Sequence, residues 1–572
     1  MNLFNYKRRR SSVVNIGSTP LGGSHPIRLQ SMTNTSTMDT ENSVSQCFRI
    51  IEAGGEYVRL TAQGVRETEN LKNVRERLNS QGCATPLIAD IHFNPKAADS
   101  AAKTVEKVRI NPGNYIDPVK TFTKLEYPDE EYAVEIEKIR ERFVPFLNIC
   151  REHKTAIRIG VNHGSLSDRI LSRYGDTPQG MVESCMEFLR ICVAENFHDV
   201  VLSIKASMTS VMVRTVRLLV RRMEEENMAF PLHLGVTEAG DGEDGRIKSA
   251  VGIGALLMEG IGDTVRVSLS EDPEFEISVC RKIIDYVNSK KDHPAISGTV
   301  FPGYNPFDPE KRKSFGIDKF GGKNPLVVIE DLVSPLFTVK QLEDWQKCES
   351  VPKFLELKYD DLDDDLLSLI KRDKETVIIL TSDHRFSVGE QKASVHHLCN
   401  EGIDNPIIIK RVYNEADIES FQVKAAMDCG VFFLDMMVDG LWLQNTSSEI
   451  SSDELKSISY GILQATGRLI SKTEYISCPG CGRTLFDLQS TIKKVKAATS
   501  HLKGLKIGIM GCIVNGPGEM ADADYGYVGA GPGKISLYKN KECIEKNIPA
   551  EKAVESLIKL IKKYGDWKDA GE

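Results

Sequence analysis

Three cysteines and one carboxylate near the C-terminus have the residue types that hold metals and move electrons. Cys478 and Cys481 form a C-x2-C pair, Cys512 follows after a long interval, and Glu519 comes shortly after it. Three thiolates and one oxygen ligand suit a [4Fe-4S] cluster in which one iron has a weaker, displaceable ligand. Such an iron can meet a substrate, so this spacing points to redox chemistry performed on the cluster itself.

Two other interpretations of these cysteines stay open on spacing alone. A C-x2-C pair often binds zinc, and Cys543 or His501 could then supply a fourth ligand. The pair could also be a dithiol redox couple. Two details favour the cluster. A proline follows Cys478, as in some ferredoxin motifs, and the glycine-rich residues 515–518 would let backbone approach a bulky inorganic core.

The composition is that of an ordinary globular protein with several domains. The 572 residues are 41% hydrophobic and 27% charged, and the net charge of −8 argues against general nucleic-acid binding. We expect no membrane span, because no apolar run is long enough, and no secretory signal, because no apolar segment follows the basic residues 7–10. The 13 cysteines are scattered, several of them in apolar stretches, as Cys185, Cys192 and Cys280 are. This usage indicates a reducing compartment, so we expect the cytoplasm.

The first half of the chain alternates short β-prone runs with helical stretches. The predicted strands are residues 27–33, 57–61, 86–91, 107–113, 156–162, 200–207, 232–240 and 264–270. Eight such units predict a TIM (β/α)8 barrel. The alternative, a doubly wound open sheet, lacks the expected G-x-G-x-x-G after its first strand.

Polar residues gather at the C-terminal ends of these strands, where TIM barrels form their active sites. They are Arg59, Asp90, His92, Arg109, Asn111, Arg158, Asn162, Lys205, Glu238, Arg266 and Ser268. Any one of the five cations could belong to a structural ion pair. Five of them at one mouth of an acidic protein predict an anionic ligand, and arginine suits phosphate, so we expect a substrate with two phosphates.

The rest of the chain divides into two further regions. Glycine and proline punctuate residues 291–325, which we interpret as a linker, and new strands are predicted at 325–330, 376–381, 405–412 and 431–434. We interpret this middle region as a barrel-like α/β insertion with a structural role, because it shows no cluster of strand-end cations. A small α/β domain then contains a strand at 505–510, a tight turn between strands 525–528 and 535–538, and a helix at 552–564. The predicted domains are 1–290, 291–470 and 471–572.

Several motifs taken together resemble the hydroxymethylbutenyl diphosphate synthase family. They are Cys478-Pro-Gly-Cys-Gly-Arg-Thr, Gly511-Cys-Ile-Val-Asn-Gly-Pro-Gly-Glu519, Gln30-Ser-Met-Thr-Asn-Thr35, Val108-Arg-Ile-Asn-Pro-Gly-Asn114 and Ile157-Arg-Ile-Gly-Val-Asn-His-Gly-Ser165. The resemblance covers the first barrel and the C-terminal domain, which also resembles part of the sulfite reductases. The middle region is similar to the insertion in the long, three-domain form of the family.

The resemblance implies an oxidoreductase of isoprenoid (terpenoid) biosynthesis by the methylerythritol phosphate pathway. It would convert 2-C-methyl-D-erythritol 2,4-cyclodiphosphate to 4-hydroxy-3-methylbut-2-enyl diphosphate with two electrons from flavodoxin or ferredoxin. Cys478, Cys481, Cys512 and Glu519 would hold a [4Fe-4S] cluster. The diphosphate would be held by Arg59, Arg109, Arg158, Lys205, Arg266, Asn162 and Ser268. The same mouth would be lined by Asp90, His92, Asn111 and Glu238. The resemblance also allows a homodimer, because the cluster domain covers a partner's barrel in the two-domain form of the family.

Two questions about mechanism follow from these residues. We expect a substrate oxygen to displace Glu519, because carboxylate is a poorer ligand than thiolate for this iron. Either Glu238 or His92 could deliver the proton to the departing oxygen. The alternative functions are a phosphate-binding barrel with a structural zinc knuckle, and a sulfite- or nitrite-reductase-like enzyme, which would need sirohaem and a fourth cysteine near Cys512.

Overall fold

The computed structural model describes residues 2–116, 126–484, 486–513, 516–520 and 522–569. They form two compact units. Unit 1 comprises Met1–Arg9, Arg246–Ile261 and Lys282–Ser471, and unit 2 comprises Arg10–Gly245, Gly262–Arg281 and Lys472–Glu572. Two helices, α9 (Gly242–Met258) and α10 (Pro273–Asn288), contribute residues to both units.

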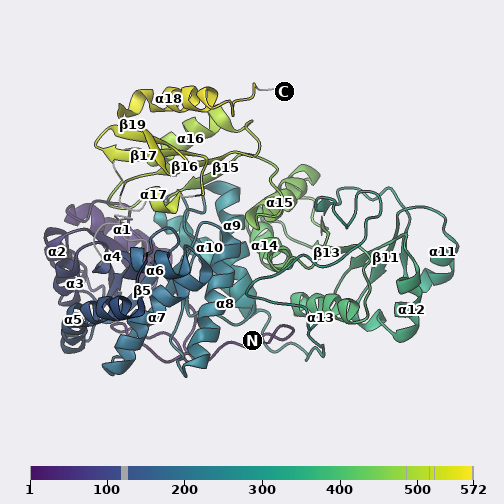
Figure 1. Ribbon diagram of the computed structural model, residues 1–572, viewed down its shortest axis with the longest axis horizontal. Coiled ribbons are helices and arrows are strands. Elements are labelled where there is room, and N and C mark those ends of the chain that lie inside the picture. The colour runs from purple at the N-terminus through teal and green to yellow at the C-terminus, as the bar shows by residue number, and fades with distance from the viewer. Residues whose placement is uncertain (1, 117–125, 485, 514–515, 521, 570–572) are drawn as a thin grey trace. The chain divides into compact units, whose positions relative to one another are not determined.

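The larger part of unit 2 is an eight-stranded parallel barrel, as predicted (Figure 1). Its strands are β1 (Arg28–Met32), β2 (Tyr57–Ala62), β3 (Leu87–Ile91), β4 (Lys107–Ile110), β5 (Ala156–Asn162), β6 (Val200–Lys205), β7 (His233–Leu234) and β8 (Thr264–Val265). They pair in the order β6-β5-β4-β3-β2-β1-β8-β7, and a parallel bridge between Leu202 and Leu232 joins the two ends. Every one of the eight predicted strands is present, and the C-terminal ends of parallel strands meet at one mouth.

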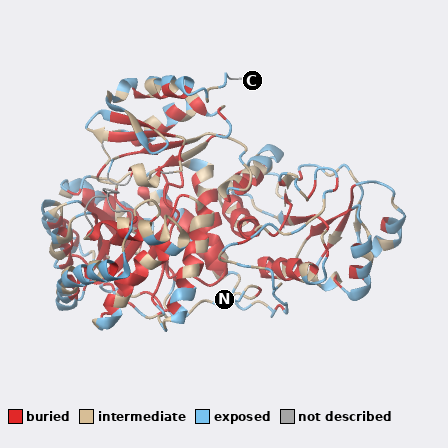
Figure 2. Ribbon diagram, viewed as in Figure 1, coloured by how far each residue is buried: buried red, intermediate tan, exposed pale blue. Residues whose placement is uncertain are grey.

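Helices connect the strands of the barrel. Before α9 and α10 they are α1 (Thr40–Glu52), α2 (Val65–Ser80), α3 (Pro95–Ala102), α4 (Pro112–Tyr115), α5 (Asp129–His153), α6 (Asp168–Tyr174), α7 (Pro178–Ala194) and α8 (Thr209–Glu225). Their starts have local causes, since the side chains of Asp39, Asn94 and Thr177 cap the first turns of α1, α3 and α7. Figure 2 shows that the strands and the inner faces of these helices are buried.

The C-terminal part of unit 2 is a small mixed sheet flanked by helices. Its strands β15 (Glu474–Ser477), β16 (Lys506–Met510), β17 (Tyr525–Gly531), β18 (Lys534–Lys539) and β19 (Glu542–Pro549) pair in chain order. Its helices are α16 (Leu488–Thr499), α17 (Gly516–Glu519) and α18 (Ala550–Lys563). The predicted tight turn between β17 and β18 is confirmed, with Gly533 at a positive φ of 65° that glycine adopts without strain. Residue 515 of the predicted glycine-rich stretch 515–518 lies outside the described residues.

Unit 1 contains a second parallel sheet, with six strands. They are β9 (Val327–Val328), β10 (Leu336–Thr338), β11 (Lys353–Leu357), β12 (Thr376–Leu380), β13 (Ile407–Tyr413) and β14 (Gly440–Asn445), in the order β10-β11-β12-β13-β14-β9. The helical elements are η1 (Val339–Gln341), α11 (Leu342–Lys347), η2 (Tyr359–Asp361), α12 (Asp364–Arg372), α13 (Ser387–Asn400), α14 (Ile418–Leu434) and α15 (Ser452–Ala465). In the described sheet β9 and β10 are edges that do not pair with each other, so the strand order is that of a barrel left open.

One predicted strand of this region is wrong. Residues 431–434, Val-Phe-Phe-Leu, are the last turn of helix α14. The helix starts at Asp417, whose carboxylate accepts hydrogen bonds from the backbone of Glu419 and Ser420, and then runs without a break to Leu434. Its last turns are buried on all sides, which explains a continuous apolar run that resembles a strand. Strands β10, β11 and β14 were not predicted.

The described helices include none that is both long and apolar enough to cross a membrane.

Candidate functional site

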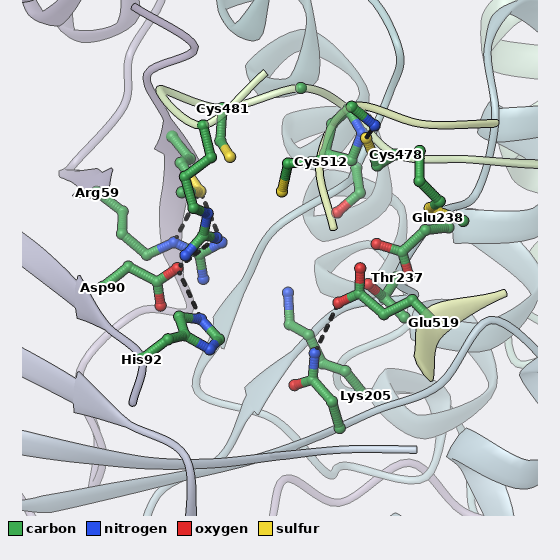
Figure 3. A pocket seen from close by; sticks show the side chains of 18 of the residues that line it. Arg59, Asp90, His92, Lys205, Thr237, Glu238, Cys478, Cys481, Cys512 and Glu519 are labelled. Atoms are coloured by element: carbon green, nitrogen blue, oxygen red, sulfur yellow. Dashed lines mark hydrogen bonds and ion pairs between the residues drawn. The ribbon is translucent and has the colours of Figure 1, made fainter. Parts of the chain in front are cut away.

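The C-terminal ends of the barrel strands and the cysteine loops of the small domain line one cavity within unit 2. Its described walls are Met32, Arg59, Asp90, His92, Arg109, Arg158, Asn162, Lys205, Thr237, Glu238, Arg266, Ser268, Cys478, Pro479, Gly480, Cys481, Arg483, Met510, Gly511, Cys512, Gly516 and Glu519. Figure 3 shows Cys478, Cys481 and Cys512 along one wall, with Lys205, Glu238 and Glu519 close to one another. All the predicted site residues except Asn111 are therefore brought together.

Asn111 has a different place in the structure. Its side-chain oxygen accepts a hydrogen bond from the backbone of Gly113 at 3.2 Å and so caps the short helix α4. Its amide nitrogen donates to the hydroxyl of Ser165 at 3.2 Å. These contacts hold the loop that follows β4 beside the loop that follows β5.

Strand register explains why the cations converge. Asp90 of β3 is paired with Arg109 of β4, which is paired with Arg158 of β5, and Asn162 is paired with Lys205 of β6. Paired residues on neighbouring parallel strands point to the same face of the sheet. Five charged or amide side chains are thereby forced into one small volume.

Three of these cations, Arg59, Arg158 and Lys205, form no salt bridge with a described carboxylate. Arg158 is 1% exposed and Lys205 is 5% exposed, and no salt bridge joins either to a described carboxylate. The Nε and Nη1 atoms of Arg158 also have no hydrogen-bond partner there. Burial and the neighbouring cations hold the pKa of Arg158 and that of Lys205 well below the ordinary values. An anion bound here would restore their charge balance.

Arg109 is the centre of a polar network on the β3–β5 side of the mouth. Its guanidinium donates to Asp90 at 3.2 Å, to the carbonyl of Gly160 at 3.0 Å and to the Asn162 amide oxygen at 2.9 Å. It also contacts Nε2 of His92. Because an arginine can only donate, this ring nitrogen is an acceptor and His92 is neutral. Burial, with the charge of Arg109, lowers the pKa of His92 to about 3.

Arg266 and Arg59 are held by groups that the sequence did not single out. Arg266 makes a bidentate pair with the buried Glu276, at 3.0 and 2.9 Å, and Ser31 donates to the same carboxylate at 2.6 Å. Arg59 has the sulfur of Met32 as its acceptor, with Nε at 3.0 Å. Met32 lies in the motif that begins at Gln30, and that motif could have identified it as a site residue. No local sequence pattern identifies Glu276.

The cysteine loops are fixed to the barrel by backbone contacts and serine hydroxyls. Ser270 donates to the carbonyl of Cys478 at 2.9 Å, and the backbone of Gly511 donates to the Cys478 sulfur at 3.2 Å. The backbones of Gly164 and Gly518 lie against each other. A Cβ on Gly164 would be 2.3 Å from the Gly518 carbonyl oxygen, and a Cβ on Gly518 would be 2.8 Å from that of Gly164. The two surfaces meet this closely because neither residue has a side chain.

Glu519 and Glu238 form a carboxylate pair at the junction. The Asn162 amide donates to Glu519 at 3.0 Å. Burial and the adjacent Glu519 raise the pKa of Glu238 well above the ordinary value. Glu238 also has a positive φ of 49°, which is uncommon for a residue with a side chain and occurs at strained functional positions.

The proposed fourth zinc ligands have other contacts. His501 Nε2 lies 3.0 Å from the carbonyl of Lys568, and its ring packs edge-on against Trp567. The Cys543 sulfur donates to the carbonyl of Glu545 at 3.8 Å. Across the described chain, no three His, Cys, Asp or Glu side chains lie close enough together to hold a single metal ion. The sulfurs around one zinc ion would lie within about 4 Å of one another.

Arg483 is the site residue that sequence reasoning missed most clearly. It lies two residues beyond Cys481 and is 8% exposed, and its Nη2 is 3.5 Å from Asp90 Oδ2. Its motif was recognised, but the role of the arginine depends on a partner about four hundred residues away in the chain.

Comparisons with known proteins agree with this geometry. Residues 11–281 match the GcpE TIM-barrel domain, and residues 474–563 match the GcpE protein C-terminal domain. A 4-hydroxy-3-methylbut-2-en-1-yl diphosphate synthase (flavodoxin) of Phocaeicola vulgatus is 60% identical, over 99% of this chain and 100% of its own. The chain belongs to the 4-hydroxy-3-methylbut-2-en-1-yl diphosphate synthase family. It therefore has that synthase activity, an oxidoreductase step of the methylerythritol phosphate pathway.

More distant members of the family also align along most of their length. The synthase (flavodoxin) of Porphyromonas gingivalis is 50% identical with full coverage of both chains. That of Chlorobaculum tepidum is 38% identical over 99% of this chain and 90% of its own. A solved N-acetylneuraminic acid synthetase from Leptospira borgpetersenii covers 51% of this chain and 94% of its own at 9% identity, with a TM-score of 0.34. The family's long form, with the middle region included, is thus the one represented here.

Proposed function

We propose that the cavity of unit 2 binds 2-C-methyl-D-erythritol 2,4-cyclodiphosphate and that its two walls divide the work of the reaction. The ring opens reductively with two electrons, and one oxygen leaves as water. One observation carries the proposal: buried cations without anionic partners and three cysteines line the same cavity. A cyclic diphosphate needs neutralisation and orientation from the first set and electrons through the second.

The group that fits the cysteine wall is a [4Fe-4S] cluster. Cys478, Cys481 and Cys512 would each hold one iron, and Glu519 the fourth, with Asn162 orienting its carboxylate. When bound, the cluster supplies electrons and Lewis acidity next to the substrate. Because carboxylate binds this iron more weakly than thiolate, Glu519 is the ligand that would give way. Glu519→Cys should keep the iron and lower turnover, and an unchanged rate would contradict this role.

The barrel wall supplies the diphosphate site. Arg158 and Lys205 are available to bind phosphate, since no described carboxylate pairs with them. Arg59, Arg109 and Arg266 line the same cavity. Ser268 and Asn162 also line this cavity and add neutral donors. As the carbon–oxygen bond breaks, negative charge grows on a phosphate oxygen, and these preorganised cations stabilise it.

The contacts of His92 favour Glu238 as the proton donor. His92 is neutral and already accepts from Arg109, so it orients that guanidinium. Glu238 lines the cavity beside Glu519, where a proton would be needed at the leaving oxygen. Glu238→Gln is expected to lower kcat by about 10²–10³-fold with a small change in KM. A larger effect of His92→Gln on kcat would reverse the assignment.

We propose residues 1–290 as the substrate domain, 291–470 as a spacer without catalytic residues, and 471–572 as the cluster domain. The cysteines and the barrel mouth belong to the same compact unit, which supports a site built from one chain. Mixing inactive Arg158→Met protein with inactive Cys512→Ser protein then restores no activity. If partner barrels were used instead, mixed dimers would regain part of it. This test does not determine whether the protein is a homodimer.

Flavodoxin is the proposed electron donor, because the relatives named above carry it in their names. The cytoplasm is the proposed location, since none of the 13 described cysteines forms a disulfide. Turnover with reduced flavodoxin, compared with reduced ferredoxin at equal potential, tests the donor.

The deciding experiment is iron, acid-labile sulfide and zinc analysis of protein purified without oxygen, followed by an assay with the cyclic diphosphate and a chemical reductant. About four irons and four sulfides per chain are expected. Cys512→Ser should lose iron and activity, whereas Cys543→Ser, in the same domain, should lose neither. One zinc and no sulfide would leave only a phosphate-binding barrel with a structural zinc knuckle.

A further inference from the structure

Arg483 belongs to the cysteine loop, yet its guanidinium reaches the barrel. It follows Cys481 by two residues, lines the cavity and lies 3.5 Å from Asp90. Gly482 brings the loop this close, since a Cβ there would be 2.6 Å from the Thr35 carbonyl oxygen and 2.8 Å from the Thr61 hydroxyl. The position of Arg483 is therefore built by close backbone packing.

The remaining donors of Arg483 have no protein partner. Its Nε and Nη1 atoms are buried and make no hydrogen bond within the described chain. The groups that interact with it electrostatically include the sulfur of Cys481, the carboxylate of Asp90 and the sulfur of Cys512. A buried cation whose unbonded N–H groups lie near the sulfurs of two proposed cluster ligands is arranged to interact with the group that those ligands hold.

Asp90 connects Arg483 to the substrate side of the cavity. Its carboxylate is shared by Arg109 at 3.2 Å and Arg483 at 3.5 Å, and it is almost completely buried. Arg59 and Arg109 overcome the opposing effect of burial and hold the pKa of Asp90 well below its ordinary value, so it is a permanent anion. Asp90 thus links two cations, Arg483 of the cysteine loop and Arg109 of the barrel, across the domain junction.

We propose that Arg483 is a positioning residue that raises the reduction potential of the redox centre at Cys481 and fixes the cysteine loop to the barrel through Asp90. This inference rests on the proposed [4Fe-4S] cluster. Adding an electron to a cluster with anionic ligands increases its negative charge, and a buried guanidinium beside one ligand stabilises that state. Hydrogen bonds to cluster sulfurs are a recognised determinant of potential.

The test is a reductive titration of anaerobically purified holoenzyme, followed by electron paramagnetic resonance, with iron and sulfide measured in parallel. Arg483→Gln should shift the one-electron reduction equilibrium about tenfold toward the oxidised form, which is about 59 mV lower in potential. Arg483→Lys should keep the potential closer to that of the wild type but lower kcat/KM, because it loses the forked geometry. Lys494→Gln, on the exposed face of α16, is the matched charge control and should leave the potential unchanged.

Asp90→Asn supplies the opposite change. It removes the carboxylate that offsets Arg483, so the potential should rise. If Arg483→Gln takes up no iron, this variant and Arg483→Lys carry the test, and an unchanged potential in Asp90→Asn would overturn the proposal. An unchanged potential in iron-loaded Arg483→Gln would overturn it as well. If the wild type itself holds no iron and sulfide, the proposed function fails first, and the role of Arg483 fails with it.

Discussion

The barrel of unit 2 and the six-stranded sheet of unit 1 are built alike, from parallel strands in chain order, but treat their charges differently. In the barrel, Arg158 and Lys205 are buried without a described anionic partner. In the sheet, Lys353 is paired with Asp373 at 2.9 Å and Lys410 with Glu356 at 2.7 Å. A buried charge left unpaired is costly unless a ligand completes it.

The comparison teaches that fold and function are separable in this chain. Parallel α/β architecture alone does not leave cations unpaired, because unit 1 has the same architecture and its Lys353 and Lys410 form internal pairs. Among the described residues, Arg411 of β13 departs from this pattern, since it has two unbonded nitrogens but lies beside Asp428. Function follows where several unpaired cations converge on one mouth.

The largest expected difference between the regions is catalytic. Arg158→Met should lower kcat/KM by about 10³-fold, because it removes a buried donor that no other protein group replaces. Lys410→Met, within strand β13 of unit 1, should change kcat/KM less than about twofold. Steady-state kinetics with the cyclic diphosphate measure both, and equal losses would assign a catalytic role to the middle region.

The second difference is in stability and has the opposite sign. Lys392 of unit 1 is buried between Glu259 at 3.3 Å and Asp435 at 3.5 Å. Lys392→Met should lower the free energy of unfolding by about 3 kcal/mol, because it removes a buried cation that contacts two buried carboxylates. Lys205→Met, the same substitution in the barrel, should not lower the stability of the ligand-free protein and should abolish turnover.

Tryptophan fluorescence can follow unit 1, since Trp345 and Trp442 lie there and only Trp567 lies in unit 2. Calorimetry of the ligand-free protein serves for Lys205→Met. A destabilised Lys205→Met protein, or a Lys392→Met protein of normal stability, would break the comparison.

The smallest effect concerns pH. His92 has a pKa of about 3 in the folded protein, below the value of about 6.5 in an unfolded chain. Its contribution to stability is therefore complete above pH 6.5 and is lost as the pH falls toward 3. Between pH 7 and pH 5, unfolding free energy should fall about 1–2 kcal/mol less in His92→Gln than in the wild type. Denaturant titrations at the two pH values measure this difference, and identical pH dependence would contradict a neutral His92.

The sequence predicts the barrel strands well because each is a short β-prone run with a helix on either side. It failed at residues 431–434, where Val, Phe and Leu favour a strand locally, but a helix capped by Asp417 continues through them. The site cysteines and strand-end cations were predictable from residue type and position. Glu276 and Arg483 were not, because their roles depend on Arg266 and Asp90, and such tertiary partners leave no local pattern.

The contact between Gly164 and Gly518 has a consequence for the oxygen sensitivity of the enzyme. A methyl group at either position would hold the cysteine loops away from the barrel mouth. Dioxygen, a small neutral molecule, would then reach the thiolates and anything bound to them faster than it does through a closed junction. The absence of two side chains, one of them next to the proposed ligand Glu519, would thus help to set how long the enzyme survives aerobic conditions.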